Sequence, residues 1–221
     1  MVLISGGLDS AVLLAHEARV GPVLPIYVSV GLAWEPAERR MLARLLLSPS
    51  LARNTAPLET LEFNMRDVYP PFHWAIQGTP PAYDTPDEDV YLVGRNLVLL
   101  TKAGVMAATR KIARVVLGPL AGNPFPDATP AFFAAMSRAL GLGLSHEVEI
   151  ATPFIDMHKD EVIRLGAELQ VPLELTLSCM NPIDAAVPLH CGLCSKCRER
   201  RDGFAAAGLS DPTGYAHASP R

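Results

Sequence analysis

The sequence lacks several features that would assign the chain to large classes of protein. Lysine and arginine (19) are fewer than aspartate and glutamate (23), so there is no basic excess, and duplex nucleic acid is not expected as the main partner. No apolar run reaches the roughly 18 residues of a membrane span, and the first residues lack the pattern of a signal peptide. We therefore expect a cytoplasmic protein without a membrane partner.

Cysteine is also scarce, and its distribution is uneven. All four cysteines lie in one segment, with the spacing Cys179-x11-Cys191-x2-Cys194-x2-Cys197. In a reducing compartment, thiols clustered in this way bind metal more often than they form disulfides. Four thiolates form a closed tetrahedral Zn²⁺ site with a structural role. The C-x2-C-x2-C part also occurs in [4Fe–4S] ligation, so the spacing favours zinc and leaves the cluster open.

The remaining composition and its periodicity indicate a globular α/β protein. Hydrophobic residues make up 49% of the chain and charged residues 19%. Apolar strand patterns alternate with helical patterns, which predicts a doubly wound parallel sheet, Rossmann-like in architecture. We expect Thr129 and Asp156 to cap two of the helices and Gly141 to end one. The expected strands are 1–4, 22–30, 58–63, 113–118 and 146–153, and the expected helices are 11–18, 36–47, 95–110, 130–141 and 156–169.

Two further segments do not follow this alternation. Residues 64–93 contain five prolines without clean periodicity, which is typical of a functional lid or of a disordered insert. The aromatic residues of the segment, among them Trp74 and Tyr83, favour an ordered lid. The alternating pattern ends at Val171, so we expect a first domain at 1–171 and a small helical cysteine module with a tail at 172–221.

The most informative motif is "SGGLDS", which lies between the first strand and the first helix. It comprises Ser5, Gly6, Gly7, Leu8, Asp9 and Ser10. Backbone N–H groups and the helix dipole make such a turn an anion site, and glycines allow the close approach that a Cβ would block. A carboxylate within a phosphate cradle is unfavourable unless a cation lies between them, so Asp9 indicates Mg²⁺. The Walker pattern and the dinucleotide fingerprint are both absent.

This loop resembles the pyrophosphate loop of the N-type ATP pyrophosphatases, the PP-loop superfamily. The resemblance implies that the loop binds the β- and γ-phosphates of ATP while the α-phosphate is attacked. A substrate oxygen then becomes an AMP ester, which a nitrogen or sulfur nucleophile displaces. The resemblance therefore implies ATP and an adenylation reaction, and it leaves the substrate open.

Further segments narrow the resemblance. The stretches "GRNLVLL", "FPDATPAFF", "TPFIDMHKDEVIRLG", "CGLCSKCRERRDGF" and "DPTGY" occur in this order. With the opening loop they resemble the 7-cyano-7-deazaguanine synthase family of queuosine biosynthesis, from about Met1 to Tyr215. The CG-x-C-x-x-C-x-x-R ending is the most specific part. The resemblance implies zinc at the four cysteines, and conversion of 7-carboxy-7-deazaguanine with ammonia and ATP to the nitrile through two adenylations.

The resemblance also implies roles for individual residues. Lys159, in "HKDEV", matches a lysine that reaches the phosphates. Gly94, Arg95 and Asn96, in "GRN", match the segment that lines the nucleotide and substrate site, and Asp127 matches an aspartate near the substrate. A guanidinium suits a carboxylate or phosphate because it can bind both oxygens. Members of the family often form homodimers, so a homodimer is one expected arrangement.

Two segments depart from the family pattern, and alternatives remain open. "VSVGLAWEPAERR" lacks the Gln-Arg-His of a "YGQRH"-like segment, and "NPFPDATP" lacks the cysteine and arginine of a "GYPDCR"-like one. A paralogue acting on another carboxylate would fit these departures. Two other hypotheses are an adenylating tRNA thiolase with an iron–sulfur cluster and a nucleotide-binding module without turnover.

Overall fold

Five short strands form one parallel sheet in the computed structural model, which describes residues 1–220. The strands are β1 (Val2–Leu3), β2 (Pro25–Ser29), β3 (Glu59–Glu62), β4 (Arg114–Val116) and β5 (Glu149–Ala151). Their order across the sheet is β3-β2-β1-β4-β5, and every pairing is parallel. Because β1 lies in the middle and the chain proceeds outward to either side, the sheet has the doubly wound topology expected from the sequence.

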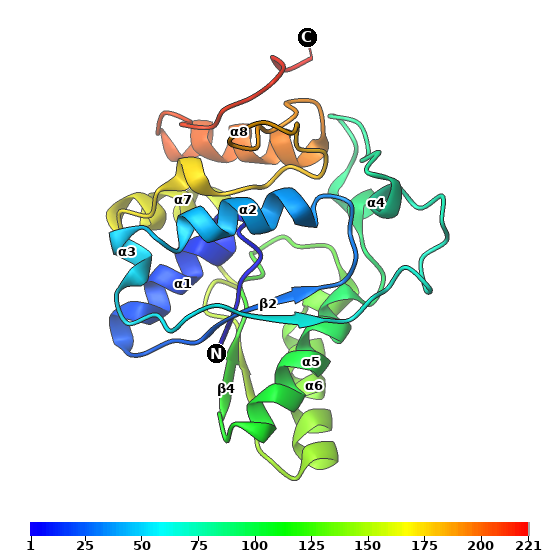
Figure 1. Ribbon diagram of the computed structural model, residues 1–221, viewed down its shortest axis with the longest axis vertical. Coiled ribbons are helices and arrows are strands. Elements are labelled where there is room, and N and C mark those ends of the chain that lie inside the picture. Colours follow the sequence, from blue (N-terminus) through cyan, green and yellow to red (C-terminus); the bar gives the residue numbers. More distant parts are fainter. Residues whose placement is uncertain (221) are drawn as a thin grey trace.

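Alternating side chains of the strands supply two hydrophobic cores, one on each face of the sheet. Val2, Ile4 and Tyr27 lie in the core with α1 (Leu8–Val20) and α7 (Lys159–Glu168). Leu3 and Ile26 lie in the core with α5 (Arg95–Thr109) and α6 (Pro130–Leu144). This alternation follows from the period of two in an extended chain. It places helices on both faces of the sheet, as Figure 1 shows for α1 on one side and α5 and α6 on the other.

The cysteine segment ends in α8 (Ser195–Ala207), which packs against α7. Figure 1 shows α8 above α7 at the end of the molecule opposite α5 and α6, with the C-terminal part of the chain beyond it. The four cysteines form a small third core with Ala37 and Met41 of α2 (Glu35–Leu45). The remaining helical elements are α3 (Pro49–Ala52), α4 (Trp74–Gln77) and the 3-10 turns η1 (Asp87–Val90), η2 (Pro126–Ala128) and η3 (Leu173–Leu175).

One expected helix cap is confirmed, and two other expected helix ends are wrong. Thr129 caps α6, since its hydroxyl accepts a hydrogen bond from the N–H of Phe132. Gly141 does not end α6, which continues to Leu144 and ends where Ser145 adopts a left-handed φ of 48°. Asp156 does not cap α7. His158 precedes that helix, and its N–H donates to the side chain of Glu161 (2.7 Å).

Segment 64–93 packs on both α2 and α8. The N–H of Ala33 donates to the carbonyl of Ala75 (2.9 Å), and the rings of Trp34 and Trp74 stack with centroids 5.8 Å apart. Farther along, Ala82 forms an antiparallel bridge with Cys194. These contacts connect the segment with the helix that follows β2 and with the cysteine cluster.

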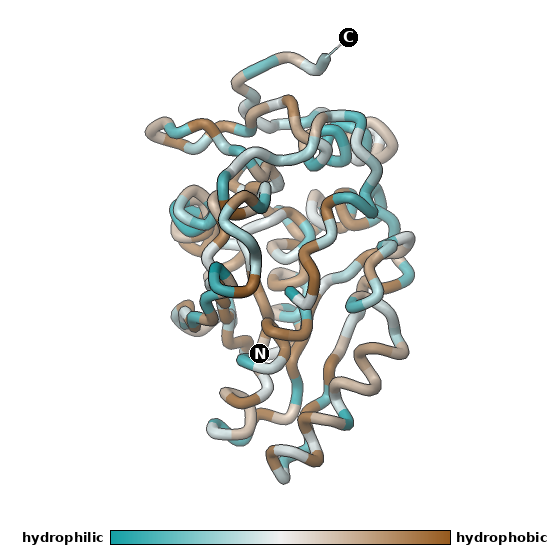
Figure 2. The backbone as a smooth tube through the Cα atoms, turned by 90° about the vertical axis from the view of Figure 1, so that its right-hand side faces the viewer, coloured by the Kyte–Doolittle hydropathy of each residue, from teal (hydrophilic) through white to brown (hydrophobic). Residues whose placement is uncertain are grey.

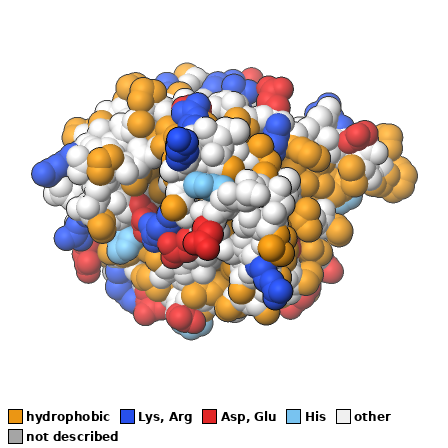
Figure 3. Space-filling view, turned by 90° about the horizontal axis from the view of Figure 1, so that it is seen from below, with side chains coloured by type: hydrophobic (Ala, Val, Ile, Leu, Met, Phe, Trp, Pro, Cys, Tyr) orange, Lys and Arg blue, Asp and Glu red, His pale blue; other side chains and the backbone are white. Residues whose placement is uncertain are grey.

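The surface is mixed in character and the interior apolar. In Figure 2 hydrophobic stretches run through the centre of the molecule, and hydrophilic ones predominate in the outer loops. On the face drawn in Figure 3, Lys and Arg side chains are interspersed with Asp and Glu side chains, consistent with the formal net charge of −4. Among residues 1–220, no helix has the length and apolar character needed to cross a membrane.

Candidate active site and metal centre

The glycine-rich loop after β1 forms a turn that is held by its own serines. The Ser10 hydroxyl donates to the carbonyl of Gly7 (2.9 Å), and the Ser5 hydroxyl accepts from the N–H of Gly7 (3.2 Å). Gly6 has a left-handed φ of 79°, and a Cβ there would lie 3.3 Å from the carbonyl oxygen of Glu38. Because α1 begins at Leu8, the N–H groups of its first turn have no intrahelical acceptors, as an anion site requires.

A cluster of four charged side chains lies beside this loop. The ammonium of Lys159 donates to both carboxylate oxygens of Asp9 (2.8 and 2.6 Å) and lies 2.7 Å from Oε1 of Glu199. Lys196 forms an ion pair with Glu199 in turn. Burial alone lowers the pKa of Lys159, but the two carboxylates outweigh it and hold the pKa above its ordinary value. Burial raises the pKa of Glu199, and the two lysines bring it down to about 2. Lys159 and Glu199 are therefore both charged near neutral pH.

A second group of residues begins α5. Gly94 precedes the helix with a left-handed φ of 75°. The backbone N–H of Asn96 donates to Oδ2 of Asp127 (3.0 Å), and the Asn96 side chain donates to the Asp127 carbonyl (3.0 Å). Asp127 is buried, which raises its pKa, while these hydrogen bonds act in the opposite direction. Arg95 carries a buried Nε with no hydrogen-bond partner among residues 1–220.

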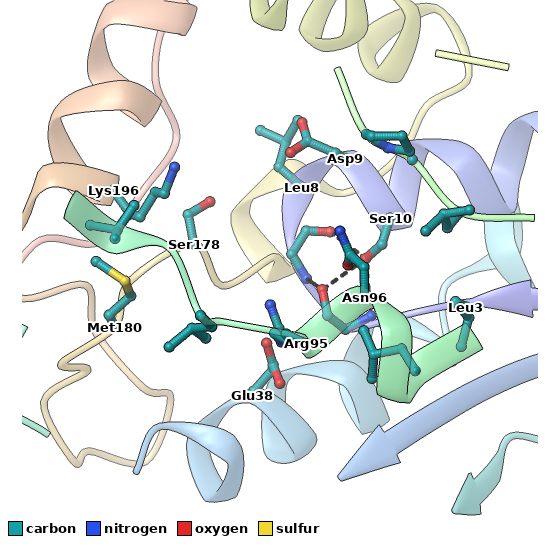
Figure 4. Close-up of a pocket in the computed structure, with 18 of the residues that line it drawn as sticks. Leu3, Leu8, Asp9, Ser10, Glu38, Arg95, Asn96, Ser178, Met180 and Lys196 are labelled. Carbon is teal, nitrogen blue, oxygen red and sulfur yellow. Dashed lines mark hydrogen bonds between the residues drawn. The ribbon is translucent and has the colours of Figure 1, made fainter. Parts of the chain in front are cut away.

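These two groups line one cavity of about 340 Å³ at the carboxyl ends of β1, β2 and β4. Figure 4 shows Asp9, Ser10 and Leu8 on one side of it and Arg95 and Asn96 facing them from α5. The structure thus brings together the expected loop, Lys159, Arg95, Asn96 and Asp127. Arg95 faces the cavity, whereas Asp127 fixes the start of α5 through Asn96. Carboxyl ends of parallel strands are where open α/β sheets bind ligands.

Some residues that line this cavity were not expected from the sequence. Glu38 is buried on α2 and accepts a hydrogen bond from the Tyr27 hydroxyl (2.7 Å), with the Trp34 ring one helical turn away. Lys196 and Glu199 reach the cavity from α8. A signal for Glu38 exists, because it lies three and four residues before Met41 and Leu42 and therefore on the apolar face of that helix.

The four cysteines converge away from this cavity. Their sulfur atoms all lie within 4.8 Å of one another, and the closest pairs are 3.5 to 3.9 Å apart. Four sulfurs at about 2.3 Å from a single tetrahedral ion are separated by roughly 3.8 Å. The arrangement therefore fits one ion, with zinc suited to four thiolates. A cubane [4Fe–4S] cluster requires more widely spaced cysteine sulfurs, because each sulfur lies outside the cube and binds a different iron at one of its corners.

The surroundings of the sulfurs also suit thiolates. Backbone N–H groups of Asn181 and Cys191 donate to Cys179, and that of Leu193 donates to Cys191. Cys194 and Cys197 lie at the start of α8, where the helix dipole favours negative charge. The Arg200 guanidinium is buried next to this cluster. It donates to Thr176 (2.8 Å) and Leu173 (2.7 Å), so it ties α8 to the preceding segment.

The chain is similar to known proteins along most of its length. Residues 1–208 match the sequence model of a family described as queuosine biosynthesis protein QueC. A relative from Methanopyrus kandleri, named 7-cyano-7-deazaguanine synthase, is 34% identical over 97% of each chain. Relatives with the same name are 32% identical (Methanoculleus marisnigri, 96% of each chain) and 33% identical (Azoarcus sp., 97% of this chain and 96% of the relative).

Proposed function

The chain belongs to the family of the queuosine biosynthesis protein QueC, and on that premise we propose that it is a 7-cyano-7-deazaguanine synthase. In this reaction ATP adenylates the carboxylate of 7-carboxy-7-deazaguanine, and ammonia displaces AMP to give an amide. A second adenylation of the amide oxygen and loss of AMP then leave the nitrile. The observation that carries the proposal is the single cavity in which the anion loop, Asp9 and Lys159 face Arg95.

The loop wall of the cavity suits the triphosphate of ATP. N–H groups of the first turn of α1 would bind the β- and γ-phosphates, since serine hydroxyls of the loop already hold the turn itself. Asp9 would bind Mg²⁺, a cation that takes one or two carboxylates together with phosphate oxygens. The ammonium of Lys159 would then donate its hydrogen bonds to a phosphate oxygen in place of Asp9. This contact would stabilise the leaving pyrophosphate.

The opposite wall suits the carboxylate that is adenylated. The unpaired Nε of Arg95 can donate to a carboxylate oxygen of the substrate, and its fixed fork of donors sets the direction of that oxygen. Asn96 and Asp127 also line the cavity. Their mutual hydrogen bonds set where α5 begins, so they would act on this reaction by positioning Arg95. Holding the carboxylate and the α-phosphate in contact supplies much of the rate through orientation alone.

The remaining assignments follow from the same proposal. Residues 1–171 would form the ATP-binding domain, with segment 64–93 as a lid through Tyr91 and Trp74, which line the cavity. Residues 172–221 would form the zinc module. Zinc has a structural role there, because four thiolates leave no open coordination position for a substrate.

An AMP-release screen tests the proposal. The protein is incubated with ATP, Mg²⁺, ammonia and a panel of carboxylates that includes 7-carboxy-7-deazaguanine, and AMP is measured. We expect AMP release with the deazaguanine carboxylate, and its loss in Asp9→Ala. An exposed aspartate variant, Asp202→Asn on α8, is the control and should keep the activity. AMP release with another carboxylate only would assign the chain to a different substrate.

A further inference from the structure

Two charged residues on α8 lie within the cysteine motif, at positions where the motif specifies no particular residue type. In the CG-x-C-x-x-C-x-x-R ending, Lys196 precedes the last cysteine, and Glu199 precedes Arg200. The side chains of Lys196 and Glu199 point away from the sulfur cluster and line the cavity. Figure 4 shows Lys196 on α8 at the edge of the cavity, beside Ser178 and Met180. The metal site needs neither residue, so their presence calls for another explanation.

The contacts of Lys159 show what Glu199 does. An ammonium has three N–H donors, and Lys159 directs them to the two oxygens of Asp9 and to Glu199. All three donors are therefore engaged before any ligand binds. When Mg²⁺ takes the Asp9 carboxylate, Lys159 loses two of these contacts and keeps the one to Glu199. Glu199 is thus the partner that can hold Lys159 in place during the exchange.

The charge of Glu199 alone would oppose this role. A carboxylate 2.7 Å from the ammonium that meets pyrophosphate would repel the phosphate oxygens. Lys196 forms an ion pair with the same carboxylate through its other oxygen, so the pair is neutral as a whole. Lys196 also lies 3.7 Å from Asp87 of η1, in the segment that borders the cavity.

The packing of α8 on α7 supports the same assignment. A Cβ on Gly203 would lie 2.5 Å from Cγ of Lys159 and 2.9 Å from Ile163. The absence of a side chain at position 203 allows α8 to approach the stem of Lys159 this closely. Both the stem and the ammonium of Lys159 are therefore placed by α8, at Gly203 and Glu199 respectively.

From these contacts we infer that Glu199 and Lys196 are positioning residues of the anion site. Glu199 holds Lys159 for the phosphates, and Lys196 neutralises Glu199 so that the phosphates are not repelled. This inference rests on the proposed function, in that Lys159 meets the phosphates of ATP. Neither residue is assigned contact with the reacting atoms.

The test is a pair of single variants and their combination. Binding of Mg²⁺ with a non-hydrolysable ATP analogue is measured by calorimetry, and kcat by AMP release. Lys196→Gln removes one of the two cations paired with Glu199 and should weaken binding roughly tenfold. Glu199→Gln removes a repulsive charge, so binding should be unchanged or tighter, while kcat falls at least about tenfold because Lys159 is misplaced. The double variant should bind like the wild type and keep the low kcat.

Controls separate this role from a merely structural one. Asp202→Asn removes an exposed carboxylate from the same helix and should change binding by less than about twofold. Glu199→Asp should recover part of kcat, and every variant should retain the metal content of the wild type. Weaker binding in both single variants, or behaviour like Asp202→Asn, would overturn the inference.

The same measurements distinguish this inference from the proposed function. Binding of the analogue requires no carboxylate. Weaker binding in Lys196→Gln without weaker binding in Glu199→Gln therefore supports the inference even if another carboxylate is the substrate. If the wild type forms the nitrile and both single variants act like the wild type, the inference fails and the proposed function stands. A wild type that binds no Mg²⁺-bound analogue would overturn both.

Discussion

At the scale of single residues, Glu38 shows how the cavity departs from an ordinary protein interior. The carboxyl group lies on the buried face of α2, as does that of Glu35, and the Tyr27 hydroxyl donates to one of its oxygens. Burial raises the pKa of Glu38 to about 7, because the charged form loses its hydration. Arg95 and the Tyr27 hydrogen bond act against this shift, and Glu35 adds to it. A buried acid that costs stability and borders a ligand cavity is typical of a functional site.

The free-energy cost of ionising the buried Glu38 predicts how the stability of the protein changes with pH. Because the folded pKa of about 7 exceeds the ordinary value of 4.5, Glu38 imposes no penalty below pH 4.5. The penalty grows as the pH rises from 4.5 to 7, levels off above 7 and amounts to about 3 kcal/mol at pH 8. Glu38→Gln keeps an acceptor for Tyr27 and carries no charge. We expect urea unfolding to show equal stability at pH 4.5 and a more stable variant at pH 8.

A matched control is Glu62→Gln at the exposed end of β3, which should leave the free energy of unfolding unchanged at both pH values. A difference between Glu38→Gln and the wild type that is the same at pH 4.5 and pH 8 would contradict the assigned burial cost.

At the scale of elements, the approach of α7 and α8 decides where Lys159 lies. Gly203 faces Cγ of Lys159 and the side chain of Ile163. Ile163 cannot move away freely because it is fully buried, and Lys159 cannot because its ammonium is bound to Asp9 and Glu199. The position of this lysine therefore depends on a glycine 44 residues later in the chain.

Gly203→Ala tests this packing. The added methyl must displace the stem of Lys159 or separate the helices, so we expect a loss of about 1–3 kcal/mol in the free energy of unfolding. We also expect weaker binding of Mg²⁺-bound ATP, measured by calorimetry. Gly208→Ala, just after the same helix, is no control, since its φ is positive. Ala206→Gly at an exposed position of α8 is suitable and should leave binding unchanged. Unchanged binding in Gly203→Ala would contradict the account.

At the scale of the whole molecule, local patterns predicted the five strands, five of the helices and the fold class. They did not predict α3, α4 or the contacts between distant segments. Alternating apolar runs located all five strands, because periodicity is a local property. The ends of α6 and α7 were wrong at Gly141 and Asp156, since a glycine can stay helical and a cap depends on local geometry. The Asp9–Lys159 contact spans 150 residues and was not predicted. The family resemblance implied only that Lys159 reaches the phosphates and that Asp9 holds Mg²⁺ beside them. Lys196 and Glu199 gave no signal, because charged residues on a helix are ordinarily solvated.

The cysteine cluster joins distant parts of the chain, so removing its metal should affect the molecule widely. Ala82 pairs with Cys194, and Arg198 donates to the carbonyl of Thr85, so segment 64–93 is fastened to α8. We expect a chelator to lower the melting temperature by about 10 °C or more and to expose residues 79–91 to proteolysis. Added Zn²⁺ should reverse both effects. An unchanged melt after the metal has been removed would contradict a structural role.

The most direct test of the central claim follows the nitrogen from ammonia into the product. The protein is incubated with 7-carboxy-7-deazaguanine, ATP, Mg²⁺ and ¹⁵N-labelled ammonia, and product and AMP are measured by mass spectrometry. The account predicts a labelled nitrile with two AMP released for each nitrile formed, because each oxygen of the carboxylate leaves through its own adenylation. No labelled product and no carboxylate-dependent AMP, from a protein that retains its metal and binds ATP, would contradict it.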